Sequence, residues 1–307
     1  MKALSNSLAP NKRMPRKGFI LRDLAAWMLM VPTILILYFW IIRPIATGII
    51  YSFCNLQGFE VIGFAGLDNY RDILSDTRFA QILSNTMKYV IWSLIIGYIP
   101  PMIVAVLLNE MVHAKGFFRF SIYFPCMISS IAASLIWYYM YLPDASGLLN
   151  RALSFIGMSK FDWLQNENAV IPLIVLSSTW KGFGGTMLMY LASLQGVNQE
   201  LYDASLVDGA GFIRRFRTVT FPHIRSIMLL FLIQQIIGVF QILTEPMTMT
   251  GGGPNNASMS MGLWSYNNAF VYFNTGHSLT ISVVMFLILI VLTFFYFALQ
   301  KKVAADE

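Results

Sequence analysis

Long apolar segments separated by shorter polar stretches dominate this chain. Six of them reach about 20 residues, the length that a helix needs to cross the hydrocarbon core of a membrane. They cover residues 24–50, 86–110, 119–142, 169–194, 224–248 and 278–300. The polar stretches between them are too short to fold alone. The pattern therefore predicts an all-α, polytopic membrane protein with six transmembrane helices.

Composition supports a membrane location. The 307 residues are 57% hydrophobic and 12% charged, whereas a soluble domain carries roughly twice that charged fraction. Much of the surface must therefore face lipid. The net charge of +6 does not indicate nucleic-acid binding, because the basic residues lie at the ends of apolar segments. The first segment exceeds the apolar run of a signal peptide, and Arg43-Pro44 replaces a cleavage site, so we expect a retained helix.

Basic residues are concentrated on one side of the predicted spans. That side carries Lys2, Lys12, Arg13, Arg16, Lys17, Arg22, Lys115, Arg119, Arg214, Arg215, Arg217, Arg225, Lys301 and Lys302. On the other side, the loop over 249–277 contains no Lys or Arg. Because cytoplasmic loops are enriched in these residues, both termini are predicted to be cytoplasmic. We expect a basic tail over 1–23, a membrane domain over 24–300 and a second tail over 301–307.

The sequence offers no catalytic, cofactor or metal site. It contains no Gly-x-x-x-x-Gly-Lys-Ser/Thr motif, and Gly251-Gly-Gly-Pro254 lacks the lysine and the helix start of a phosphate-binding loop. His113, His223 and His277 are far apart in the sequence and form no metal cluster or nucleophile–base pair. The two cysteines have no metal-ligand spacing and are expected to be small buried hydrophobes.

The polar loop over about 195–225 has the features of a docking element. Asn198 can cap a helix that begins at the next residue. Ala204 and Ser205 lie on one face of that helix and are small enough for close approach by a partner. Gly209 suits a position just past a helix end, where φ is often positive, and Pro222 is expected to stop the chain again before the fifth span. From these residues alone, an amphipathic helix lying among lipid headgroups is an equal alternative.

The spacing within this loop resembles the EAA coupling loop of bacterial ABC importer permeases. That family pattern is Glu-Ala-Ala, three residues, Gly, nine residues and Ile-x-Leu-Pro. Here Asp203, Ala204 and Ser205 stand for the first three residues, and Gly209 stands for the glycine. Val219, Phe221 and Pro222 stand for the end of the pattern. The spacing matches throughout, and the departures from the family residues keep the chemical type.

The resemblance implies a type I ABC importer permease fold and a subunit without enzymatic activity of its own. ATP hydrolysis would occur on two partner ATPase subunits, which would receive the coupling helix in a groove. The implied ATPase-coupling residues are Asp203, Ala204, Ser205, Leu206, Asp208, Gly209, Ala210 and Pro222. A second, homologous permease subunit and an extracytoplasmic solute-binding protein would complete the importer in a bacterial cell membrane.

A second resemblance concerns the substrate. Leu201–Gly211 and Thr250–Asn255 are similar to the maltose-type and glycerol-3-phosphate-type carbohydrate permeases, which implies a carbohydrate substrate. Within that class we favour an oligosaccharide. The candidate substrate-path residues in the fourth and fifth spans are Ser178, Trp180, Lys181, Gly182, Gln235 and Gln241. Interhelical hydrogen bonding by the glutamines and packing or interface anchoring by the tryptophan are the competing interpretations.

Two alternatives stay open at this stage. Lys181 indicates either an anionic substrate, such as a uronate or a phosphate ester, or a carboxylate partner, for which Glu245 is a candidate. An ion-coupled secondary transporter is the rival class. It would usually show inverted repeats, broken helices or acidic groups at mid-membrane, whereas Glu110 and Glu245 lie at the ends of predicted spans.

Overall fold

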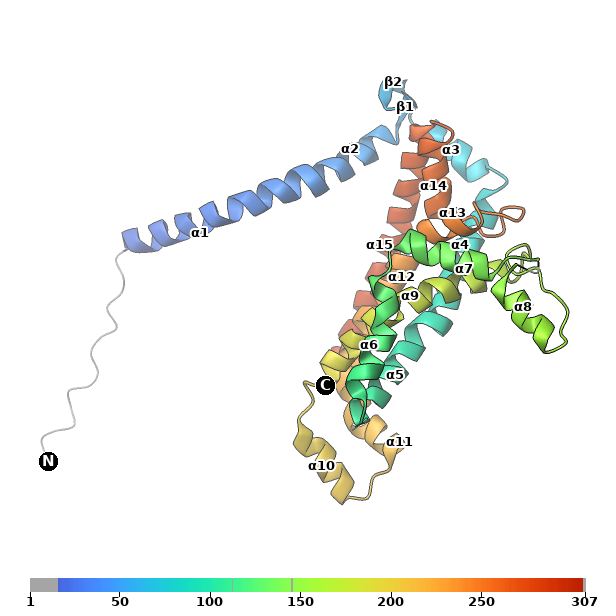
Figure 1. Ribbon diagram of the computed structural model, residues 1–307. Helices are drawn as coiled ribbons and strands as arrows, with labels where there is room; N and C mark the ends of the chain where they lie inside the picture. Colours follow the sequence, from blue (N-terminus) through green and yellow to red (C-terminus); the bar gives the residue numbers. More distant parts are fainter. Residues whose placement is uncertain (1–15, 112, 145, 306–307) are drawn as a thin grey trace, which may run out of the picture. The chain divides into compact units, whose positions relative to one another are not determined.

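The computed structural model describes residues 16–111, 113–144 and 146–305. The chain divides into two units, with the boundary between Tyr51 and Ser52. The first unit contains α1 (Arg16–Leu37), a π-helical segment (Tyr38–Ile42) and α2 (Arg43–Tyr51), which run as one rod (Figure 1). Its stretch Ala26–Tyr51 is long and apolar enough to cross a membrane, as the sequence predicts for 24–50.

The second unit is helical apart from one short hairpin (Figure 1). Its first half contains β1 (Cys54–Gln57), β2 (Glu60–Phe64), α3 (Asp68–Ser75), α4 (Phe79–Ser93), a π-helical segment (Leu94–Tyr98), α5 (Ile99–Glu110), α6 (Lys115–Tyr123), a 3-10 turn (Phe124–Met127), α7 (Ser130–Met140) and α8 (Leu148–Phe155). Its second half contains α9 (Val170–Leu194), α10 (Gln199–Val207), α11 (Phe212–Arg215), a π-helical segment (Phe216–Thr220), α12 (Phe221–Phe240), α13 (Thr244–Met249), α14 (Met261–Phe270) and α15 (Thr275–Ala305). The two strands pair antiparallel.

The predicted count of six spans is not confirmed. Within the described residues, four helical stretches are long and apolar enough to cross a membrane: Ala26–Tyr51, Phe79–Glu110, Phe212–Met249 and Thr275–Ala298. The third predicted span is a bent pair, Lys115–Met127 and Ser130–Met140, whose axes differ by 97°. Helix α9 has the length of a span, but the polar and glycine-rich run from Ser177 to Gly185 lowers its mean hydropathy. The sequence therefore located the apolar segments without showing how they bend.

A proline follows each of the three described π-helical segments by two residues. These prolines are Pro44, Pro100 and Pro222. A proline inside a helix has no N–H to donate, and its ring collides with the carbonyl four residues earlier. A locally widened turn removes that collision without ending the helix. Each long helix therefore continues through its proline.

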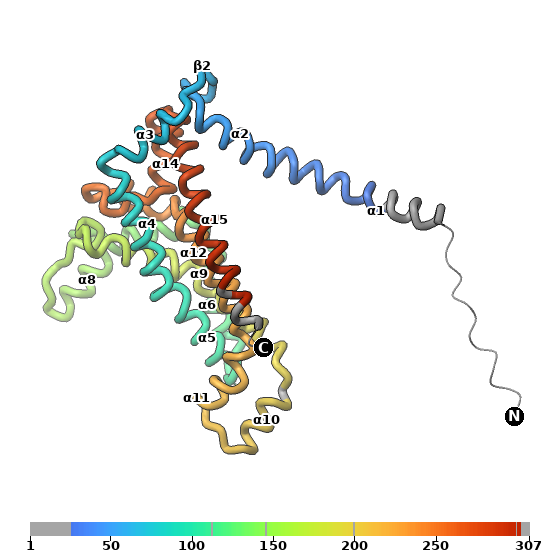
Figure 2. Tube along the Cα trace, turned by 180° about the vertical axis from the view of Figure 1, so that it is seen from behind, coloured from blue at the N-terminus to red at the C-terminus, as the bar shows by residue number. Residues whose placement is uncertain are grey.

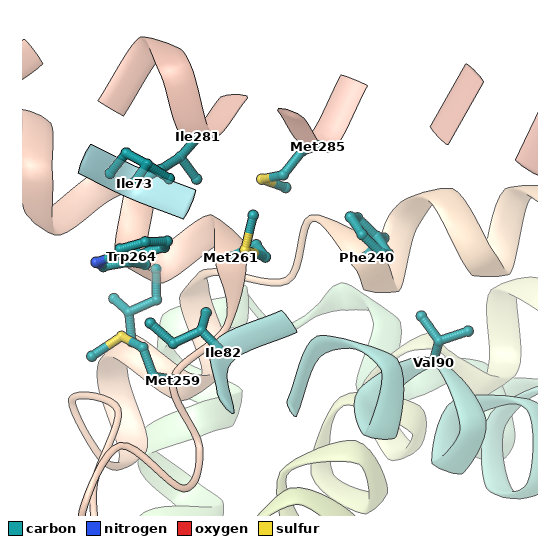
Figure 3. Close-up of a cluster of buried hydrophobic side chains, with 10 residues drawn as sticks. Ile73, Ile82, Val90, Phe240, Met259, Met261, Trp264, Ile281 and Met285 are labelled. Atoms are coloured by element: carbon teal, nitrogen blue, oxygen red, sulfur yellow. The ribbon is translucent and has the colours of Figure 1, made fainter. Parts of the chain in front are cut away.

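The interior of the second unit is built from side chains that are far apart in sequence. One buried cluster joins α3, α4, α12, α14 and α15 with the loop before α14 (Figure 3), and consists of Ile73, Ile82, Val90, Phe240, Met259, Met261, Leu263, Trp264, Ile281 and Met285. On another side, α6 approaches α9 closely at Gly184, where a Cβ would lie 2.4 Å from the carbonyl oxygen of Ile122. Only glycine permits this approach.

The segment between α13 and α14 is held by side chains of α4. The amide of Asn85 donates to the carbonyl oxygens of Asn256, at 2.7 Å, and Met259, at 3.3 Å. The buried Tyr89 hydroxyl donates to the Ser258 carbonyl at 3.0 Å. Because α4 supplies these donors, the loop after the fifth apolar segment is fixed to the second one.

The start of α4 is fixed by an aspartate that lies before the apolar part of the helix. Asp76 accepts hydrogen bonds from the backbone N–H and the guanidinium of Arg78, the shortest at 2.7 Å. These bonds, above all the side-chain bond from Arg78, lower the pKa of the Asp76 carboxyl. The ionised form is therefore favoured in the folded protein.

Candidate functional site

Helix α10 begins and ends as its sequence predicts. The Asn198 side-chain oxygen accepts a hydrogen bond from the Glu200 N–H at 3.0 Å, which caps the helix start. At the other end Gly209 has φ +69°. Its N–H donates to the Leu206 carbonyl at 3.0 Å, and the Ala210 N–H donates to the Ser205 carbonyl at 2.9 Å. These two bonds form a Schellman motif, which needs positive φ at the glycine.

Two side-chain contacts tie this loop to the helices of the bundle. The buried Tyr202 hydroxyl lies 3.0 Å from the Thr220 hydroxyl, so α10 is joined to the helical stretch that continues into α12. Arg215 on α11 forms an ion pair with Glu110 at the end of α5, with 2.5 Å between Nη2 and Oε2. Both views show α10 and α11 at the end of the second unit opposite to β1, β2 and α3 (Figures 1 and 2). The loop is thus a fixed projection.

The outward face of α10 is exposed. Leu201 and Leu206 are each more than half exposed, and Val207 is 89% exposed. The side chains of Ala204 and Asp208 are exposed as well. Of the predicted ATPase-coupling residues Asp203, Ala204, Ser205, Leu206, Asp208, Gly209, Ala210 and Pro222, only Ala210 is buried and Ser205 is half-buried. The projection therefore presents small and apolar side chains beside carboxylates.

The predicted stop at Pro222 is wrong. The chain is helical from α11 through the π-helical segment into α12, and Pro222 occupies the first turn of α12. The widened turn at Phe216–Thr220 accommodates the proline ring, as described above. The helix is therefore continuous from α11 into α12.

A polar cavity of about 210 Å³ lies between α9, α12, α13 and the π-helical segment of residues 94–98. We call it the polar cavity. Its lining includes Thr179, Thr186, Gln235 and Glu245. Among the described residues, the side chains of the two threonines and the glutamine have no hydrogen-bond partner. Unpaired polar groups inside a membrane helix bundle raise the free energy of the folded protein unless a ligand or water bonds to them.

Gly97 allows the polar groups to converge. A Cβ at this position would lie 2.9 Å from the Thr179 hydroxyl oxygen and 3.1 Å from the Gln235 amide nitrogen. Thr179 and Gln235 come from different helices, α9 and α12. The close approach of the second apolar segment therefore forms one wall of the cavity.

The structure brings together three of the six predicted substrate-path residues. Ser178, Gly182 and Gln235 line the polar cavity. Trp180 lines a neighbouring apolar pocket of about 540 Å³, where its ring packs edge-on to Trp137 with 5.9 Å between centroids.

Gln241 and Lys181 lie elsewhere. Gln241 borders a separate space beside Ser282 and Met285 of α15 and does not line the polar cavity. Lys181 borders a narrow recess behind the polar cavity, together with Ser178 and Glu245. Lys181 follows Ser178 by about one turn of α9 and shares the recess with it, and Gln241 follows the end of α12 at Phe240.

Other residues that line the polar cavity were not among the predicted substrate-path residues. Gly97, Thr179, Phe183 and Thr186 line the polar cavity, and Thr179 and Phe183 also line the apolar pocket. Thr179, Phe183 and Thr186 lie among or just after Ser178, Trp180, Lys181 and Gly182, the candidates predicted from the fourth span. Gly97 carried no signal of its own, because its role depends on a contact with another helix.

The family is shown by sequence comparison. The family described as "Binding-protein-dependent transport system inner membrane component" matches residues 91–305. The chain belongs to this family. It is therefore a multi-pass membrane permease component, and the fold agrees with that membership.

Relatives match this permease over most of its length. It is 29% identical to the arabinooligosaccharides transport system permease protein AraP of Bacillus subtilis over 91% of this chain and 89% of AraP. It is 30% identical to the lactose transport system permease protein LacF of Rhizobium radiobacter, over 91% of this chain and 96% of LacF. It is 28% identical to the sn-glycerol-3-phosphate transport system permease protein UgpA of Agrobacterium fabrum, over 95% of this chain and 96% of UgpA.

A solved structure has the same fold. A chain from the crystal structure of a bacterial ABC transporter involved in the import of the acidic polysaccharide alginate superposes with a TM-score of 0.82 at 20% identity, covering 93% of this permease and 98% of that chain. A second crystal structure, of the alginate transporter in complex with an alginate pentasaccharide-bound periplasmic protein, superposes equally well at 19% identity. The permease thus has the fold of an ABC importer subunit.

Proposed function

We propose that this permease is the transmembrane subunit of a bacterial ABC importer for a carbohydrate, and that the substrate is an oligosaccharide. Family membership and the sugar transport systems named for AraP and LacF support the carbohydrate class. The observation that carries the proposal is the fixed projection of α10, which combines the spacing of a coupling loop with a Schellman end at Gly209.

In this proposal α10 docks on an ATPase subunit. The docking residues are Asp203, Ala204, Ser205, Leu206, Asp208, Gly209, Ala210 and Pro222. Two ATPase copies serve two permease subunits, this one and a homologous partner, and they carry out all ATP hydrolysis. Exposed leucines and a small alanine let the partner approach closely, and the carboxylates set its orientation.

The same contacts that hold the loop would transmit its movement. When the ATPase subunits close, α10 would move as a rigid body because its cap and its Schellman end are fully bonded. The Tyr202–Thr220 contact would pass this movement to α12, and the Arg215–Glu110 ion pair would pass it to α5. Helices α5 and α12 border α9, so the polar cavity would open to alternate sides of the membrane.

The polar cavity would hold the sugar during passage. Hydroxyl and amide groups that lack partners suit the hydroxyls of a carbohydrate, and Trp180 in the adjoining pocket supplies a flat apolar face. The solute-binding protein would deliver the sugar from the side opposite to α10, where residues 249–277 lie. In this orientation both termini are cytoplasmic.

The test is sugar-stimulated ATP hydrolysis by the complete complex. The permease is co-expressed with the second permease and the ATPase, purified, and assayed with the solute-binding protein and a panel of oligosaccharides. We expect the ATPase to co-purify and at least one sugar to stimulate hydrolysis. Purification without an ATPase, together with transport driven only by an ion gradient, would replace the proposal with a secondary transporter.

A further inference from the structure

Two charged side chains lie at or beside the polar cavity, and only one of them lines it. Glu245, in the first turn of α13, lines both the polar cavity and the narrow recess behind it. Lys181, in the middle of α9, lines the recess only. Among the described residues that line the polar cavity, Glu245 is the only charged one. A ligand in the cavity would therefore meet a carboxylate before an ammonium group.

The recess has no room for a ligand group. Its walls leave no volume in which even a water molecule fits. Lys181 and Glu245 are both half-buried, and both border this recess. Opposite charges at membrane depth usually stabilise each other. The lysine therefore borders a closed recess beside an acidic group and does not form an open anion site.

The remaining lining of the polar cavity is neutral and rich in hydrogen-bonding groups. Thr179, Thr186 and Gln235 supply donors and acceptors that have no partner among the described residues. A carboxylate adds strong acceptors for hydroxyl donors. A sugar hydroxyl can bond to every one of these groups, whereas an anionic group would be repelled by Glu245 in an environment that screens charge poorly.

We infer that the permease admits uncharged carbohydrates and rejects uronates and phosphate esters, with Glu245 as the residue that sets this charge selectivity. The inference rests on the proposed function and narrows its substrate class. Family membership leaves that class open, because the names of its relatives include transport systems for lactose and for sn-glycerol-3-phosphate. Lys181 borders the same recess as Glu245 but does not itself line the polar cavity.

The test compares matched neutral and anionic sugars on the assembled complex. Lactose and maltotriose are each paired with the derivative oxidised at C6, which differs by a carboxylate. Binding to the permease–ATPase complex in nanodiscs is measured by saturation-transfer NMR without the solute-binding protein, whose own selectivity would otherwise contribute. We expect the wild type to favour a neutral form at least tenfold.

Variants then locate the selectivity. Glu245→Gln leaves Lys181 uncompensated and should shift the preference at least tenfold toward the uronate. Glu245→Asp keeps the charge and should keep the wild-type preference. The double variant Lys181→Met with Glu245→Gln carries no charge, and its preference should fall between the wild type and Glu245→Gln. ATPase co-purification confirms that each variant assembles.

Several results would overturn the inference. These are a wild-type preference for a uronate, binding of neither form, or a Glu245→Gln preference within twofold of the wild type. Failure of the proposed function is separate from these. If an anionic sugar stimulates ATP hydrolysis, the importer function stands and the charge selectivity is refuted. If the permease assembles with no ATPase, the importer function itself is refuted.

Discussion

Replacing Gly209 with alanine isolates the backbone geometry on which the coupling projection depends. Gly209 has φ +69°, and a Cβ at this position would meet no atom within 4 Å. The substitution therefore adds no collision with neighbouring side chains. Its cost is the left-handed conformation itself, about 1–2 kcal/mol for a residue with a Cβ. Gly209→Val should cost more, because β-branched residues tolerate positive φ least.

This cost translates into a measurable loss of ATPase affinity. If the docking geometry needs the Schellman end, the population of competent α10 falls by the same free energy, and the apparent Kd rises in proportion. About 1–2 kcal/mol corresponds to roughly 5- to 30-fold. The Kd is measured by titrating the purified ATPase onto the permease pair in nanodiscs, with biolayer interferometry as the readout.

Gly211 provides a matched control two residues along the same loop. A Cβ at this position would also meet no atom within 4 Å, but the φ of Gly211 is −66°. Gly211→Ala should therefore leave the ATPase Kd within about twofold of the wild type, since alanine adopts this backbone without strain. Equal Kd values for Gly209→Ala and Gly211→Ala would refute the link between the positive φ and docking.

Three further changes test the packing. Gly184→Ala forces a methyl group against the backbone of α6 and should cost at least about 1–3 kcal/mol, seen as a lower Tm by scanning fluorimetry, whereas Gly185→Ala, with its nearest neighbour at 3.9 Å, should change Tm little. Tyr202→Phe leaves the buried Thr220 hydroxyl without its partner and should lower sugar-stimulated ATP hydrolysis more than ATPase binding; equal losses would contradict the transmission role. Asp76→Ala should lower Tm at pH 7, because it removes the hydrogen bonds that Asp76 accepts from Arg78 just before α4. Because the pKa of Asp76 is lowered in the folded state, the difference in Tm between variant and wild type should shrink as the pH falls through that pKa. A Tm difference that stays constant down to pH 3 would contradict this prediction.

Local chemistry explains why the two ends of α10 could be predicted from sequence. The cap at Asn198 and the positive φ at Gly209 depend on contacts within a few residues, and such contacts are encoded by neighbouring side chains. The prediction that Pro222 stops the helix was wrong, because this outcome depends on distant contacts. Whether a proline ends a helix or is absorbed by a widened turn depends on the packing of the helix on both sides.

The positions of the apolar segments could likewise be predicted from the sequence, whereas the angles between helices could not. Hydropathy located the segments because the cost of exposing polar groups to lipid is a property of composition. It could not show that Lys115–Met127 and Ser130–Met140 meet at 97°, or that α9 carries a polar run toward the interior of the bundle. These features are decided by how helices from distant parts of the chain pack together.

The membrane location, the apolar segments and the ends of α10 could be predicted from the sequence, since each follows from composition or from contacts between near neighbours. The polar cavity could not, because it depends on packing between distant helices. Gly97, Thr179 and Gln235 meet because three helical segments converge, and Lys181 borders the recess with Glu245 instead of the polar cavity. Interhelical distances of this kind arise from packing over the whole bundle, which no single stretch of sequence contains.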